Sequence, residues 1–131
     1  MTPLIAGIFS LFSTTNDFKT AISSRMYFEE APQNVDFPYC VVSIISSEHN
    51  WTFSDTFEDV LVQFSIFTQD SSAVNIGTYW GYLISLFDSA SLTVSGYSSI
   101  FMHRGQSRLM RETEDNIWQY VVEYDCEVEK A

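Results

Sequence analysis

Basic residues are scarce in this sequence. Only 6 lysines and arginines stand against 17 aspartates and glutamates in 131 residues, which gives a formal net charge of −11 at pH 7. Proteins that bind duplex DNA tightly rely on lysine and arginine to neutralise phosphates, so this composition argues against tight DNA binding. The composition is still compatible with a protein that lies beside DNA, because a negatively charged surface lets a polyanion pass without binding it.

Cysteines and long apolar runs are also few. The two cysteines, Cys40 and Cys126, fall at apolar positions of predicted strands, where a free thiol packs as a small hydrophobic side chain. We therefore expect free thiols and no disulfide. The apolar stretch at residues 4–12 is too short to cross a bilayer, and no basic residue precedes it as in a signal peptide. These features predict a soluble protein, with no membrane partner, that folds inside the cell.

Motifs of enzymes and metal sites are missing from the sequence. It has no phosphate-binding glycine loop, no nucleophile elbow and no pair of cysteines or histidines at metal-ligand spacing. The two histidines, His49 and His103, could form a zinc site with the cysteines only if four distant segments converged. We therefore predict that the protein is not an enzyme and has no catalytic residues, no metal and no cofactor.

The clearest pattern present is an alternation with a period of two at residues 116–129. One side carries Trp118, Tyr120, Val122, Tyr124, Cys126 and Val128. The other side ends in Glu123, Asp125, Glu127 and Glu129. This pattern predicts a long antiparallel strand with one buried face, and carboxylates about 7 Å apart along the other. Such a row repels itself, so it faces water, a basic partner surface or an open channel.

The remaining segments predict a single α+β domain over residues 1–131. Apolar residues at helical spacing indicate helices at residues 4–12 and 73–88, with a further helical turn after a break near residues 14–17. Residues 26–29, 39–48, 57–68 and 100–111 read as further strands, of which the second and third form a hairpin. We therefore expect one antiparallel or mostly antiparallel β-sheet packed against two α-helices, in the order α-β-β-β-α-β-β.

Two groups of residues are candidates for contacts with partners. Trp51 and Phe53 lie near the tip of the predicted hairpin, where large aromatics serve either local packing or a binding surface. Arg104, Arg108 and Arg111 form a basic region in an acidic chain. Arg104 and Arg108 are an even number of residues apart, which predicts that they share a strand face. They could pair with acidic residues of their own chain or of another subunit.

Several runs of the sequence resemble the tail completion, or tail terminator, proteins of long-tailed bacteriophages. These runs are RMY at 25–27, APQ at 31–33, FPYCVV at 37–42, VQFSIF at 62–67, LFD at 86–88 and WQYVVEY at 118–124. The resemblance implies a virion structural protein at the head-proximal end of the tail, assembled in the host cytoplasm. It implies a hexameric ring that caps the tail tube, fixes tail length and joins the tail to the head connector. The implied partners are other copies of the chain, the major tail tube protein and the connector protein, with phage DNA passing through the lumen.

A different class of protein is also compatible with the composition. Aromatic residues make up 16% of the chain and could line a pocket instead of filling a core, which would make the protein a small-ligand-binding α+β domain. Oligomeric state separates the two hypotheses, because a tail terminator forms or joins a sixfold ring and a pocket protein does not.

Overall fold

The computed structural model describes residues 2–14, 16–51, 56–69, 74–88, 92, 97–112 and 116–130. Three helices and five strands are formed by these residues. The helices are α1 (Thr2–Phe12), α2 (Asp17–Ala21) and α3 (Val74–Phe87). The strands are β1 (Met26–Phe28), β2 (Tyr39–Trp51), β3 (Thr56–Gln69), β4 (Tyr97–Glu112) and β5 (Ile117–Lys130). None of the described helices is long and apolar enough to span a membrane.

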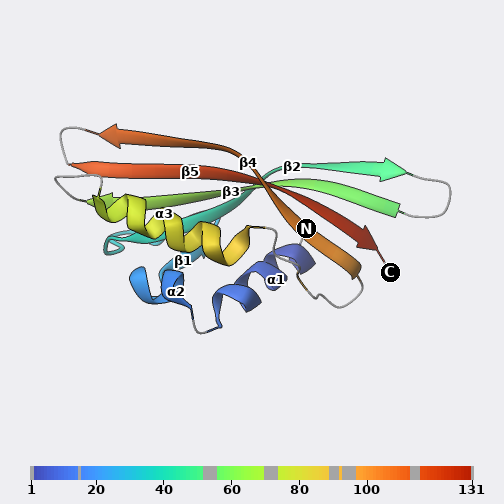
Figure 1. Ribbon diagram of the computed structural model, residues 1–131, viewed down its shortest axis with the longest axis horizontal. Helices are drawn as coiled ribbons and strands as arrows, with labels where there is room; N and C mark the ends of the chain where they lie inside the picture. Colours follow the sequence, from blue (N-terminus) through green and yellow to red (C-terminus); the bar gives the residue numbers. More distant parts are fainter. Residues whose placement is uncertain are drawn as a thin grey trace.

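The strands form one sheet in the order β1-β2-β3-β5-β4, with the helices on one side of it (Figure 1). The predicted α+β class is confirmed. The predicted pattern needs correction, because β1 pairs with β2 in parallel and the sheet is therefore mixed. The described residues form three helices instead of the expected two, because the short helical turn predicted after the break is a separate helix, α2. We call the side of the sheet away from the helices the open face.

The break between α1 and α2 is stabilised by Asn16. Its backbone is extended, with φ −153° and ψ 161°, and its side-chain oxygen accepts a hydrogen bond from the Lys19 amide at 2.7 Å. Its side-chain nitrogen donates to the carbonyls of Phe12 at 3.0 Å and Thr14 at 2.7 Å. One side chain thus satisfies free backbone groups of two helix ends, which is why the chain turns at this point.

The core lies between the helices and the sheet. The predicted apolar side of β5 is confirmed: its residues from Val122 onward are fully buried at every second position, and Trp118 and Tyr120 are partly buried. The helices contribute Leu4 and Ile8 of α1, Phe18 of α2, and Ile76, Leu83 and Phe87 of α3. Alternation along β5 therefore separates a core face from the open face.

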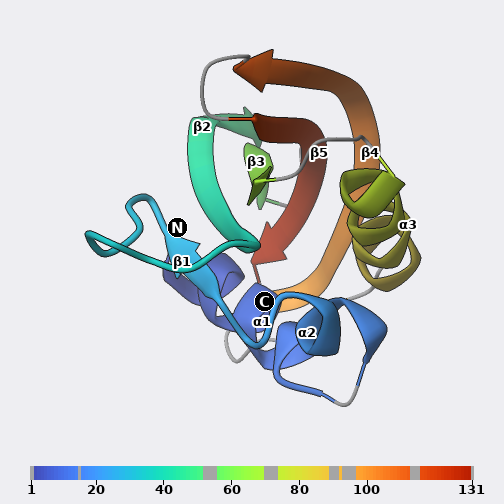
Figure 2. The ribbon, with the colours of Figure 1, turned by 90° about the vertical axis from the view of Figure 1, so that its left-hand side faces the viewer.

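Two β-bulges lie on either side of one row of residues that crosses the sheet. Ile44 pairs with Val62, Val62 with Tyr124, and Tyr124 with Arg104. The ladder shifts next to this row in two strands, between Ile44 and Ser46 in β2 and between Arg104 and Ser107 in β4. Bulges increase the local right-handed twist, and the sheet is strongly twisted near its middle (Figure 1) and curves around the helices (Figure 2).

Candidate functional site

The acidic residues predicted on β5 lie together on the open face. Glu123 is half-buried, whereas Asp125 and Glu127 are exposed. The backbone of Glu129 pairs with Phe57 on one side and Ser99 on the other, so it continues the ladder, but its side chain is outside the described residues. The register of the sheet extends this row onto β3, where Asp59 pairs with Glu127.

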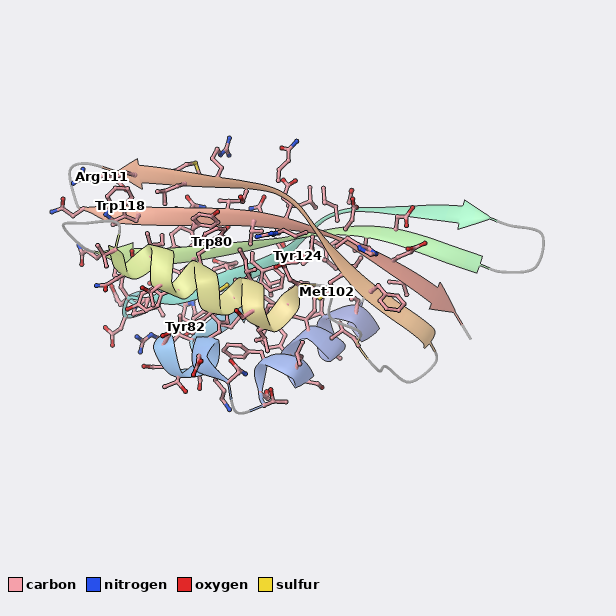
Figure 3. All side chains as sticks on the ribbon, viewed as in Figure 1. Trp80, Tyr82, Met102, Arg111, Trp118 and Tyr124 are labelled. Atoms are coloured by element: carbon pink, nitrogen blue, oxygen red, sulfur yellow. The ribbon has the colours of Figure 1, made fainter. Side chains whose placement is uncertain are left out.

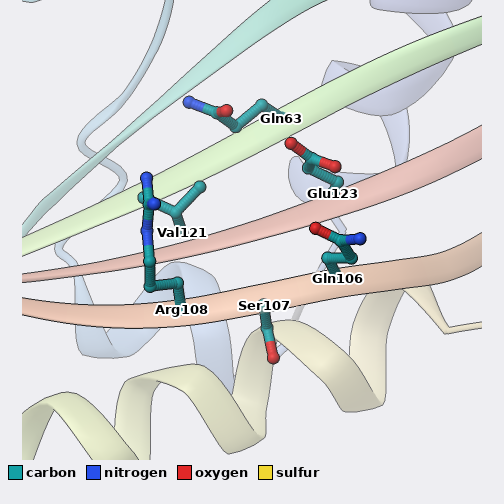
Figure 4. A pocket seen from close by; sticks show the side chains of 6 residues that line it. All are labelled: Gln63, Gln106, Ser107, Arg108, Val121 and Glu123. Atoms are coloured by element: carbon teal, nitrogen blue, oxygen red, sulfur yellow. The ribbon is translucent and has the colours of Figure 1, made fainter.

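Two shallow hollows cross the open face beside the bulge of β4. The first has a volume of about 240 Å³ and is lined by Gln63, Gln106, Ser107, Arg108, Val121 and Glu123 (Figure 4). The second, of about 360 Å³, is lined by Ser46, Asp59, Leu61, Gly105, Gln106, Glu123 and Asp125. Gln106 and Glu123 belong to both, so the hollows adjoin at the bulge. Most of the residues that line them have polar side chains, which suits contact with a hydrated surface better than burial of an apolar ligand.

The three arginines of β4 do not share one face. Arg104 pairs with Tyr124 and lies on the helix side, whereas Arg108 pairs with Val121 and lies on the open face. The prediction that Arg104 and Arg108 lie on the same face is therefore wrong. The bulge places Gly105 and Gln106 opposite the single residue Glu123, and this extra residue reverses the alternation.

Each arginine of β4 has a different environment. Arg104 Nε lies 3.5 Å from Asp88 Oδ2, just beyond α3. The Arg111 guanidinium stacks over the Trp118 ring at 4.9 Å from its centroid, and Nη2 donates to Asn116 Oδ1 at 3.1 Å (Figure 3). Arg108 is exposed, and among the described residues it has no ion-pair partner within 4.0 Å. Arg108 is thus the arginine of β4 that is available to another molecule.

The pair of Arg104 and Asp88 extends inward to a buried hydroxyl. The Tyr124 hydroxyl donates a hydrogen bond to Asp88 Oδ1 at 2.7 Å, and the Tyr124 side chain is fully buried. Burial, together with the neighbouring Asp88 carboxylate, raises the pKa of Tyr124 above its usual value. This chain of contacts joins β5, the end of α3 and the bulge of β4, and it positions the strand without supplying a reactive group.

The two cysteines are free and buried. Burial raises the pKa of the Cys126 thiol to about 12 and raises that of Cys40 as well. Both side chains therefore stay protonated and pack as apolar groups. Within the described parts of the chain, no three histidine, cysteine or acidic side chains are placed to hold a metal ion.

The aromatic side chains pack against one another in the core. The Phe64 ring lies 4.7 Å from Phe87 and 5.7 Å from Tyr124, between ring centroids. The Trp80 and Tyr120 rings are 4.9 Å apart. Aromatic residues that the sequence offered as a pocket lining thus fill the space between α3 and the sheet. The contact residues predicted near the hairpin tip lie outside the described part of the structure: this applies to Phe53 and to the side chain of Trp51.

No family model matches this chain, and no curated protein matches it by sequence. Its fold is similar to that of a solved chain in the virion of a native gene transfer agent particle. The TM-score is 0.81, and the match covers 98% of this chain and 96% of that chain at 12% sequence identity. The two chains share a fold along almost their whole length. At this level of identity the likeness establishes the architecture alone.

Sequence reasoning found the acidic row on β5 but missed its extension. Asp59 is next to the buried Val60 in β3, and this alternation indicates that Asp59 lies on the open face. Only the pairing of β3 with β5 shows that Asp59 lies opposite Glu127. The role of Asp88 was missed as well, because nothing in the sequence connects the end of α3 with Arg104 and Tyr124.

Proposed function

We propose that this chain is a structural virion protein that forms a hexameric ring on the tail tube. In this proposal the ring caps the tube, fixes tail length, and joins the tail to the head connector at the head-proximal end of the tail. The observation that carries the proposal is the fold shared, over 98% of this chain, with a chain of a gene transfer agent virion. The family resemblance of the sequence supports the more specific role of tail terminator.

The charge of the open face supports a place beside DNA. Asp59, Glu123, Asp125 and Glu127 lie there, in a chain whose net charge is −11. A negative wall repels phosphates, so DNA passes such a surface without binding to it. In the proposed ring this face lines the lumen, and the ring assembles in the host cytoplasm before it becomes part of the virion.

The proposed contacts outside the ring are with the major tail tube protein and the connector protein. For these we propose Trp51 and Phe53, which lie near the tip of the β2–β3 hairpin in sequence and are the kind of aromatic residue that anchors interfaces. A Trp51→Ala, Phe53→Ala variant keeps the backbone groups of β2 and is expected to form rings but fail to cap tubes. Normal tail termination by this variant would contradict the contact.

The test of the proposed function is the mass of the assembled protein. Size-exclusion chromatography with light scattering is run across concentration, with and without tail tubes built from the tube protein of the same genome. We expect six copies per particle, either free or at tube ends, and electron microscopy to show one ring per capped tube. A protein that stays monomeric and ignores tubes would contradict the proposal and favour the alternative of a ligand-binding domain.

A further inference from the structure

Strand β4 is a long sheet edge that the described chain does not cover. It spans 16 residues at the margin of the sheet, and among the described strands only β5 pairs with it. Seven consecutive residues, from position 103 to position 109, are exposed, so neither face of this part of the strand is covered. Alternate peptide groups of an edge strand point away from the sheet, where they are free to pair with another strand.

The opposite margin of the sheet is open over part of β2. Strand β1 pairs with β2 only from Cys40 to Val42. The chain then turns away at Glu29, whose φ is 65°, and the Glu29 side chain accepts the hydrogen bond of the Ile44 amide at 2.9 Å. Beyond this point residues 45–51 of β2 have no strand on their outer side within the described part of the chain.

The directions of these two edges suit head-to-tail pairing. Each neighbouring pair from β2 through β3 and β5 to β4 is antiparallel, so β4 runs antiparallel to β2. When the sheet is repeated side by side, β4 of one copy therefore meets β2 of the next in antiparallel orientation. The bulges of β2 and β4 lie beside the same row of residues across the sheet. Because a bulge increases the twist of its strand, both edges become more twisted at the same position along the sheet.

The charges of the two edges are complementary. Strand β4 carries three arginines and one glutamate, a net charge of +2. Residues 28–51, which form the other margin, contain Glu29, Glu30, Asp36 and Glu48 but no lysine or arginine, a net charge of −4. Opposite charges favour contact between different edges and disfavour pairing of two identical edges. Two different complementary edges are what a closed ring of identical subunits requires.

We propose that the free edge of β4 docks on the free edge of β2, at residues 45–51, of a second copy of this chain. The sheets of neighbouring subunits then continue into one another, with residues 99–103 of β4 level with residues 46–50 of β2. Arg108 is level with Val41, so it meets the part of the neighbour's acidic margin next to β1 that contains Glu29. This inference rests on the proposed ring and names the surface that closes it.

Hydrogen–deuterium exchange of the wild-type protein, compared between monomer and assembled ring, tests the pairing. Amides of β4 and of residues 45–51 should exchange more slowly in the ring by roughly tenfold or more, because they gain hydrogen-bond partners. A ring in which neither segment gains protection would overturn the edge contact and leave the proposed function standing. Protection of both segments in an assembly that ignores tail tubes would support the contact and contradict the proposed function. A protein that never associates would overturn both.

A charge variant provides a second readout. Arg108→Glu should weaken ring formation by roughly tenfold or more, because it places like charge against the acidic margin. Lys19→Glu makes the same change on α2, away from both edges, and should assemble like the wild type. Equal assembly of the two variants would overturn the role of Arg108.

Discussion

At the scale of single residues, a buried hydroxyl connects three elements of the fold. The Tyr124 hydroxyl donates to Asp88 at 2.7 Å, and Asp88 also lies near Arg104. A buried hydroxyl contributes to stability only while its hydrogen-bond partner is present. Tyr124 therefore joins the core and the bulge of β4 through one hydrogen bond.

Removing this hydroxyl should destabilise the protein. For Tyr124→Phe we expect the free energy of unfolding to fall by about 1.5 to 3 kcal/mol, the range for a hydrogen bond to a charged group. Urea denaturation measures the change. Tyr120→Phe, on the same face of β5, is the matched control and should cost less, because no hydroxyl hydrogen bond holds Tyr120 among the described contacts. Equal stability of Tyr124→Phe and the wild type would contradict the argument.

The buried thiols predict a loss of stability in alkali. Their pKa is raised in the folded state, to about 12 for Cys126, from an ordinary value of 9.0. The unfolded chain therefore releases these protons first, so the stabilisation is present below pH 9 and is lost as pH rises toward the folded pKa. Above pH 9, each thiol should lower the free energy of unfolding by about 1.4 kcal/mol per pH unit.

Denaturation at pH 8, 9 and 10 in the presence of a reductant measures this slope. Cys126→Ala removes one of the two thiols and should make the slope shallower, whatever its effect on stability at pH 8. A slope that is unchanged in this variant would show that other groups cause the alkaline loss.

At the scale of elements, Asn16 determines how α1 and α2 are joined. Its oxygen caps α2 and its nitrogen holds two carbonyls at the end of α1. Asn16→Ala should lower the free energy of unfolding by about 1 kcal/mol or more, the usual cost of losing an N-cap. Asn16→Asp keeps the cap but loses the donor, so its stability should lie between those of the wild type and Asn16→Ala. Chemical denaturation of the three proteins gives the order, and equal stability of the two variants would contradict the role of the cap oxygen.

The bulge of β4 is the second decisive feature at this scale. Gly105 and Gln106 together oppose Glu123, so the side chains before and after them exchange faces. Because of this shift, Arg104 lies on the helix side, where it pairs with Asp88, and Arg108 lies on the open face. β4 therefore carries an arginine on each side of the sheet. Without the extra residue, Arg104 and Arg108 would lie on the same side.

At the scale of the whole molecule, the acidic open face is expected to act in DNA passage. Glu123→Lys combined with Asp125→Lys should leave ring formation unchanged and impair DNA delivery, because the reversed charges hold phosphates as they pass. Light scattering measures the first property, and infectivity or DNA transfer measures the second. Asp17→Lys reverses a charge on the helix side and should deliver DNA normally.

Two other results would change this interpretation. If the double variant is monomeric, the acidic row belongs to a subunit interface instead of the lumen. If both assembly and delivery are normal, the row has neither role.

Sequence by itself determined the local properties of this protein. Alternation at residues 116–129 assigned the buried and open sides of β5, and helical spacing placed α1 and α3, because these patterns report which side of an element meets the core. The acidic character of Glu123, Asp125 and Glu127 followed from the same alternation.

Only the tertiary structure decided what depends on pairing between distant segments. The parallel contact of β1, the position of Asp59 beside Glu127, and the opposite faces of Arg104 and Arg108 all follow from strand register and bulges. A pattern within one segment does not fix its register with another. Register is set by how the whole sheet packs against the helices, which minimises exposed apolar surface across all strands together.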